Sequence, residues 1–275
     1  MGTLLKRTVF GLLFTLVVVG GLLTPWGLLA LVVLLSVLLG YEFFKMTVET
    51  RFRKEAVCIS LASLTALVLL FFHFQAGLPL RFVGLAFIPV ALAHILLLFD
   101  AALDHAFPAA VYFPLLYVTL PLAAALWLAW PGGVFTWRLL LGLIVLLWLN
   151  DIGAYVFGMS MGQRPDSRKL FPALSPKKSW IGVVGGTLFS FLAAWVVSAT
   201  FGAAVLPRVH WFALALMVSV FGVLGDLYES LLKRHAGVKD ASQLIPGHGG
   251  LLDRFDDVIF VLPLAALYLS LFSLL

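Results

Sequence analysis

The sequence predicts an all-α fold, a polytopic bundle of transmembrane helices with a cytoplasmic N-terminus. Two observations predict it. The 275 residues are 63% hydrophobic and only 11% charged, whereas soluble domains carry about 25% charged residues. The apolar residues also form nearly continuous runs, and backbone groups in lipid must be paired internally, as helices allow. We therefore expect one integral membrane domain over 1–275, with N-terminal helices in 1–130 and motif-bearing helices and loops in 134–275.

Transmembrane helices are expected wherever an apolar run approaches about 20 residues, with a range of roughly 17–25. Nine runs do so, and in chain order they are Thr8–Leu23, Trp26–Phe44, Val57–Gln75, Phe82–Phe99, Phe107–Trp130, Val134–Gly158, Ile181–Phe201, Trp211–Leu232 and Val258–Leu275. Only Thr24 and Pro25 separate the first two runs. A transmembrane β-barrel would instead show roughly ten-residue segments of alternating hydrophobicity, a pattern that this sequence lacks.

The placement of positive charge predicts the orientation, since cytoplasmic loops carry an excess of Lys and Arg. With a cytoplasmic N-terminus, only Arg81, Arg138 and Arg208 of the 18 lysines and arginines fall in outer connections, and none of the 13 acidic residues does. Two long polar segments, Met159–Trp180 and Lys233–Asp257, also fall on the inner side. We therefore expect the functional site at the cytoplasmic face, where basic residues attract anionic lipids at about 1 kcal/mol each.

Acidic residues within apolar runs mark the candidate site. Asp151, Asp226 and Glu229 fall at or near the inner ends of such runs, where an acid costs up to about 2.5–3.5 kcal/mol on insertion scales. Such residues usually face a cavity, a partner charge or a metal, and a helix cap at the interface is the alternative. The spacing i, i+3, i+4 and i+7 places four polar residues on one helix face. They are Asp226, Glu229, Ser230 and Lys233.

A second acidic cluster predicts a divalent cation. Asp253, Asp256 and Asp257 fall within one turn, where their carboxylates repel one another unless a cation lies among them. Hard oxygen ligands suit Mg²⁺, which proteins hold with one or two carboxylates plus substrate phosphates. The alternative is a solvated acidic helix start, stabilised by the helix dipole. Cys58 is the only cysteine, which excludes a thiolate metal cluster.

A basic, glycine-rich segment separates the two acidic clusters. It begins with Lys233 and Arg234, continues through Lys239 and ends in Pro246–Gly250. Glycines let backbone N–H groups converge on an anion, and Lys and Arg supply charge for phosphate. Basic groups between carboxylates therefore predict a metal-chelated polyphosphate.

The earlier cytoplasmic loop offers a second phosphate-binding candidate. Ser175 and Pro176 are expected to form the N-cap and first residue of a helix. Lys177 and Lys178 would then stand in its first turn, where a bound anion would offset the unfavourable dipole. The alternative is that both lysines only anchor the chain at the inner face.

Three stretches carry a family resemblance: Asn150–Tyr155, Leu174–Trp180 and Gly225–Asp257. In order, spacing and membrane context they resemble the motifs of phosphatidate cytidylyltransferases (CDP-diacylglycerol synthases). The N-terminal half resembles that family in topology only. Ile181 stands where the family usually has an acidic residue, so a role for that acid cannot be carried over.

The resemblance implies transfer of a cytidylyl group from CTP to phosphatidate, giving CDP-diacylglycerol and pyrophosphate with Mg²⁺, a second cation being left open. It implies these catalytic residues: Asp151, Asp226, Lys233, Arg234, Asp253 and Arg254. The implied substrate-binding residues are Lys177, Lys178, Ser230, Lys239, His248, Gly249 and Gly250. The implied metal ligands are Asp226, Asp253 and Asp256. We expect a bacterial inner membrane, membrane lipids as partners, no nucleic acid, and leave a homodimer open.

Rival functions remain open at this point. A CTP-dependent polyprenol kinase would share the topology and a partly similar arrangement of motifs, but its small product would be CDP. The same transfer to a different lipid, such as an archaeal ether lipid, is a second rival. An ion-coupled transporter would use intramembrane acids for ions and prolines for gating, but would not need a basic glycine-rich loop.

Overall fold

The computed structural model describes residues 3–47, 52–98, 112–244 and 249–275. Contacts between residues divide the chain into two compact units. The N-terminal unit comprises Met1–Phe135 together with Asp240–Arg254, and the C-terminal unit comprises Thr136–Lys239 together with Phe255–Leu275. Asp240–Arg254 therefore belongs with the N-terminal helices, although it lies more than a hundred residues beyond them in sequence.

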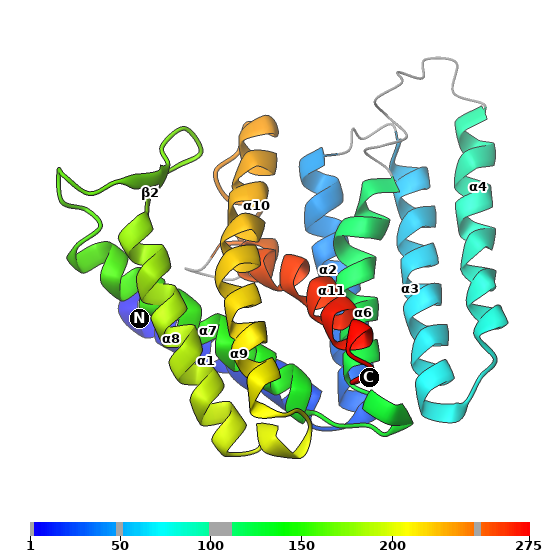
Figure 1. The fold of residues 1–275 in the computed structure, drawn as a ribbon. Coiled ribbons are helices and arrows are strands. Elements are labelled where there is room, and N and C mark those ends of the chain that lie inside the picture. Colours follow the sequence, from blue (N-terminus) through cyan, green and yellow to red (C-terminus); the bar gives the residue numbers. More distant parts are fainter. Residues whose placement is uncertain (1–2, 48–51, 99–111, 245–248) are drawn as a thin grey trace. The chain divides into compact units, whose positions relative to one another are not determined.

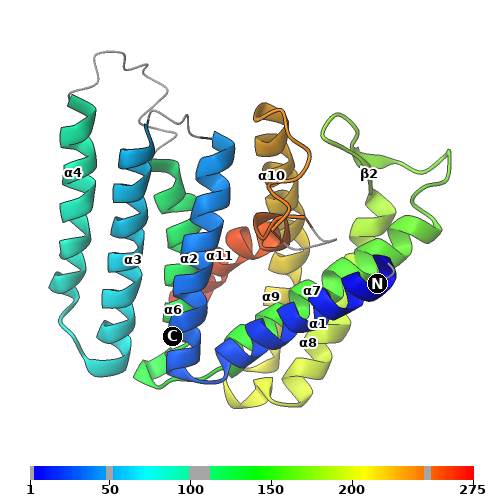
Figure 2. The same cartoon turned by 180° about the vertical axis from the view of Figure 1, so that it is seen from behind.

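The N-terminal unit is a set of apolar helices (Figure 1 and Figure 2). Its elements in order are α1 (Thr3–Leu22), α2 (Pro25–Thr47), α3 (Arg53–Ala76), a 3₁₀ turn (Leu80–Ala86), α4 (Phe87–Leu98), a π-helical turn (Leu115–Thr119), α6 (Leu120–Leu128), a 3₁₀ turn (Pro131–Gly133) and a late 3₁₀ turn (Leu252–Arg254). The Thr24 hydroxyl accepts a hydrogen bond from the Gly27 N–H at 3.0 Å, and Pro25 takes the first helical position, where it suits a helix start. Aromatic residues pack the interior, with Phe71 contacting Trp130 at 5.7 Å between ring centroids.

The C-terminal unit contains α7 (Arg138–Ser160), the hairpin of β1 (Lys169–Phe171) and β2 (Ser175–Ser179), α8 (Trp180–Ala199), a 3₁₀ turn (Gly202–Ala204), α9 (Arg208–Met217), a π-helical turn (Val218–Gly222), α10 (Val223–His235) and α11 (Asp256–Leu271). Glycines bring α7 and α8 into close contact, as small residues do between membrane helices. A Cβ atom on Gly153 would lie 2.4 Å from the Gly185 carbonyl oxygen, and one on Gly186 would lie 2.9 Å from the Asn150 carbonyl oxygen.

The prediction of an all-α membrane fold is confirmed. Among the described residues, five helices are long and apolar enough to cross a membrane: Pro25–Thr47, Arg53–Ala76, Arg138–Ser160, Trp180–Ala199 and Arg208–His235. Shorter apolar helices lie at Thr8–Leu22, Leu80–Leu96 and Tyr112–Leu128. The count of nine spans and the cytoplasmic N-terminus stay predictions.

The expected helix start at Ser175 and Pro176 is wrong. These residues belong to β2, which pairs antiparallel with β1, and α8 begins only at Trp180. Ser179 is the N-cap instead, and its hydroxyl accepts a hydrogen bond from the Gly182 N–H at 3.2 Å. Both serines suit a cap, but strand pairing keeps the backbone of the first one extended.

Candidate functional site

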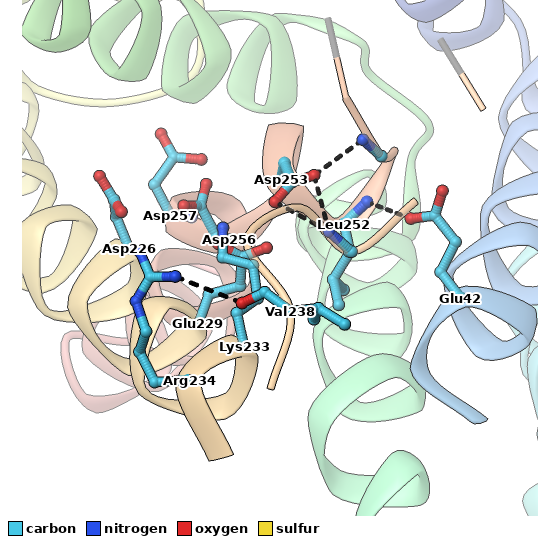
Figure 3. A network of polar contacts seen from close by, with 12 residues as sticks. Glu42, Asp226, Glu229, Lys233, Arg234, Val238, Leu252, Asp253, Asp256 and Asp257 are labelled. Carbon is cyan, nitrogen blue, oxygen red and sulfur yellow. Dashed lines mark hydrogen bonds and ion pairs between the residues drawn. The ribbon is translucent and has the colours of Figure 1, made fainter. Parts of the chain in front are cut away.

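A polar face on α10 forms the centre of the candidate site. Asp226, Glu229 and Lys233 follow helical spacing on that face, and Glu229 is completely buried. Gly225 lets α10 approach the start of α11, since a Cβ atom there would lie 2.4 Å from the Asp256 carbonyl oxygen. This close approach brings the acids of the two helices together, as Figure 3 shows.

Three carboxylates of this unit have the arrangement of a cation site. One carboxylate oxygen from each of Asp226, Glu229 and Asp256 lies within 4.8 Å of the other two. Hard oxygen donors in such a group fit a divalent cation such as Mg²⁺. Asp226 and Asp256 were predicted as ligands from the sequence. Glu229 was predicted only to share the polar helix face, and its three-residue spacing from Asp226 was the available signal for a ligand role.

Lysine side chains pair with two carboxylates of this cluster. Lys178 of β2 forms an ion pair with Asp226, and Lys233 forms one with Glu229 one helical turn away. The Lys233 and Glu229 side chains are only 12% and 1% exposed. A buried charge needs a partner, and the two lysines neutralise the acids. Because Lys178 lies on β2, the hairpin also places a residue of the second motif at the site.

The first motif reaches the same region through α7. Asp151 lies on that helix with an exposed side chain and acts electrostatically on both Asp256 and Asp257. The start of α11 is stabilised by its own acids. The Asp257 N–H donates to Asp256 Oδ1 at 3.0 Å, and the Val258 N–H donates to Asp257 Oδ1 at 2.7 Å. Asp256 and Asp257 lie in the first turn of α11, where the helix dipole favours negative charge.

The remaining predicted residues of this unit lie around the end of α10 and in the hairpin. Arg234 is exposed and donates through Nη1 to the Val238 carbonyl at 3.3 Å. Gly237 adopts a positive φ of 68°, which lets the chain turn sharply after the helix. Ser230 is half-buried, and Lys177 and Lys239 are exposed.

Five other predicted residues belong to the N-terminal unit or lie outside the described residues. Asp253 is half-buried and accepts hydrogen bonds from the Gly250 N–H at 2.7 Å and the Ala241 N–H at 3.2 Å. Gly249 has a positive φ of 83°. Arg254 is exposed, and His248 lies outside the described residues. The predicted metal role of Asp253 is untested and stays a prediction.

These features define the chain as an α-helical membrane protein with a carboxylate cluster suited to a divalent cation and paired with lysines. A family profile described as "Cytidylyltransferase family" matches residues 5–272. The chain belongs to this family, and the resemblance read from its motifs is confirmed.

Curated relatives share its sequence over part of their length. A phosphatidate cytidylyltransferase of Bacillus subtilis is 43% identical over 129 residues, which cover 47% of this chain and 46% of the relative. One of Staphylococcus epidermidis is 45% identical over 132 residues, covering 46% and 47%. One of Staphylococcus aureus is 46% identical over 124 residues, covering 44% of each. The match thus spans a little under half the length of these relatives.

Proposed function

We propose that this protein is a phosphatidate cytidylyltransferase. It would transfer a cytidylyl group from CTP to the lipid phosphate of phosphatidate, giving CDP-diacylglycerol and pyrophosphate. The observation that carries the proposal is that residues from each of the three motifs lie in the C-terminal unit. There Lys178 on β2 pairs with Asp226, the carboxylates of α10 and α11 lie together, and Asp151 on α7 acts electrostatically on Asp256. The bacterial relatives of that name support it.

The proposed reaction is an in-line displacement at phosphorus. An oxygen of the phosphatidate phosphate forms a bond to the α-phosphorus of CTP. The bond from that phosphorus to the bridging oxygen breaks, and pyrophosphate leaves with the electron pair. The attacking phosphate monoester has a second pKa of about 6 and is already largely ionised at neutral pH. The chain therefore needs no general base, and its task is to bring two polyanions together.

The carboxylate cluster is the proposed Mg²⁺ site. Asp226, Glu229 and Asp256 would hold the ion, and Asp253 stays a proposed further ligand. When bound, Mg²⁺ supplies charge to polarise and align the phosphates. Support comes from the donor set, since three acidic side chains with oxygens within 4.8 Å of one another repel strongly without a positive charge between them.

Lysines are the proposed phosphate ligands. Lys178 and Lys233 neutralise Asp226 and Glu229 in the structure. A cation at the cluster would take over this role, and each ammonium group would then pair with a phosphate oxygen of the substrates. Lys is a common phosphate ligand that acts as a point charge. Arg234, together with the other basic residues predicted from the motifs, would complete the cationic surface.

We further propose that the site faces the cytoplasm of a bacterial inner membrane. Phosphatidate is confined to the bilayer and CTP is dissolved in the cytoplasm, so the transfer has to occur at their boundary. The uneven distribution of Lys and Arg over the connections supports this orientation.

A single assay tests the proposed function. Purified protein in detergent micelles receives phosphatidate, CTP and Mg²⁺, and both products are quantified. We expect CDP-diacylglycerol and pyrophosphate in equal amounts. CDP with a phosphorylated lipid would show a kinase instead, and the absence of any CTP-dependent product would contradict an enzymatic role in this reaction.

A further inference from the structure

A buried acid in the N-terminal unit accepts hydrogen bonds from residues on both sides of the glycine-rich segment. Glu42 lies in the apolar helix α2 and is completely buried. Its Oε1 accepts from the Leu251 N–H at 2.9 Å and from the Ser242 hydroxyl, and its Oε2 accepts from the Leu252 N–H at 2.7 Å. These partners lie 200 or more residues further along the chain. Figure 3 shows the carboxylate directed at the loop backbone.

The same carboxylate joins both sides of the loop. Ser242 precedes the glycine-rich segment and Leu251 and Leu252 follow it, so Glu42 joins residues from both sides of that segment. Asp253 also joins two parts of this region. It accepts one hydrogen bond from the Ala241 N–H and another from the Gly250 N–H. We call these two acids and their partners the loop clasp.

Gly250 stands where the two acids of the loop clasp meet. A Cβ atom there would lie 3.0 Å from Glu42 Oε2, 3.0 Å from Asp253 Oδ2 and 2.9 Å from the Ser242 nitrogen. A larger residue would force both carboxylates away from the backbone. The loop clasp therefore depends on glycine at this position for space.

We propose that Glu42 is a positioning residue, which holds the backbone of residues 241–244 and 249–252 in the arrangement that CTP binding requires. The inference rests on the proposed function for the identity of the nucleotide, but not for the loop clasp itself. A charged acceptor suits this role, since hydrogen bonds to a carboxylate are stronger than those to neutral groups. The amide of a Gln side chain at position 42 would place an NH₂ donor opposite a backbone N–H donor, and one of the two hydrogen bonds to the backbone would be lost.

The test compares two buried acids of the same unit. Glu42→Gln should raise the KM for CTP about tenfold or more, the scale of one lost hydrogen bond to a charged group. The KM for phosphatidate should stay unchanged, and kcat should fall less than kcat/KM for CTP. Glu55→Gln is the matched control. Glu55 is also buried, in α3, and no hydrogen bond joins it to the loop among the described residues, so its kinetics should match wild type.

Hydrogen exchange gives a readout that does not depend on catalysis. Amides of the loop clasp, in residues 241–253, should exchange faster in Glu42→Gln than in wild type or Glu55→Gln. Ser242→Ala removes the hydroxyl that donates to Glu42 and should give a smaller increase in exchange. This variant keeps the test available if Glu42→Gln folds poorly. Unchanged loop exchange and an unchanged KM for CTP would overturn the proposal, as would equal effects of Glu42→Gln and Glu55→Gln. Wild-type protein without cytidylyl transfer would reject the proposed function alone, since the exchange result would still test the loop clasp.

Discussion

Lys178 of the β-hairpin forms an ion pair with Asp226 in the first turn of α10. The two residues belong to different sequence motifs, and both lie in the C-terminal unit. Their side chains are 23% and 40% exposed, so water and solutes can reach the pair. Asp226 is also a candidate metal ligand. A metal ion could therefore replace the Lys178 ammonium group as the positive partner of Asp226.

The first prediction concerns the carboxylate cluster. Glu229→Gln and Asp256→Asn each remove a charged oxygen donor. Each should raise the Mg²⁺ concentration for half-maximal CDP-diacylglycerol formation at least about tenfold, the scale on which even outer-shell partners of a metal act. A Mg²⁺ titration of the purified variants measures this. Asp166→Asn, an exposed acid between α7 and the hairpin, is the control, and a shift of the same size there would contradict the assignment.

Lys178→Gln should change two quantities in opposite directions. Loss of its ammonium group should lower kcat/KM for CTP about tenfold, because a charge-assisted contact to phosphate disappears. The apparent affinity for Mg²⁺ should rise, since Asp226 no longer has a competing positive partner. Lys177→Gln removes the same charge from an exposed neighbour and should do less to both. A Lys178→Gln variant with weaker Mg²⁺ binding would contradict the exchange of positive charges proposed at Asp226.

Gly225→Ala should separate the two helices that carry the cluster. The added Cβ would lie 2.4 Å from the Asp256 carbonyl oxygen, and such overpacking typically costs about 1–3 kcal/mol. We expect a lower thermal unfolding midpoint in detergent and little remaining activity. The added Cβ in Gly40→Ala on α2 meets no atom within 4 Å, so this control should unfold at or above the wild-type temperature. Equal midpoints for the two variants would show that α10 and α11 do not pack as described.

Asp253→Asn separates two roles for one side chain. If Asp253 binds the metal as well as the loop backbone, the variant should lose turnover and need more Mg²⁺. If it acts only within the loop clasp, loop exchange should rise while the Mg²⁺ requirement stays unchanged. We expect both changes, and an unaltered Mg²⁺ requirement would remove Asp253 from the metal site. Turnover and loop exchange near wild type would remove it from both roles.

Much of the C-terminal unit could be predicted from local patterns. Hydrophobic length places the helices, and the three-residue spacing on α10 places Asp226 and Glu229 on one face. Helical spacing is a local property, so it is visible in one stretch of sequence. The pairing of β1 with β2 was not visible, because a short hairpin with polar residues shows no hydrophobic alternation.

Glu42 illustrates what a sequence pattern cannot show. Its partners are mostly backbone N–H groups, which every residue except proline carries, so nothing in the sequence marks them as partners. The packing of Asp240–Arg254 with the N-terminal helices was equally hidden, since the loop sits between two segments of the other unit. The available signal was that Glu42 is the one acidic residue of the largely apolar α2.

The most direct test of the central claim is the location of a bound cation. Crystals of the protein grown with Mn²⁺, a stand-in for Mg²⁺ with usable anomalous scattering, would give an anomalous difference map. We expect a peak bound by oxygens of Asp226, Glu229 and Asp256, which should vanish in Glu229→Gln. A Mn²⁺ peak elsewhere, with none at these three residues, would contradict the account.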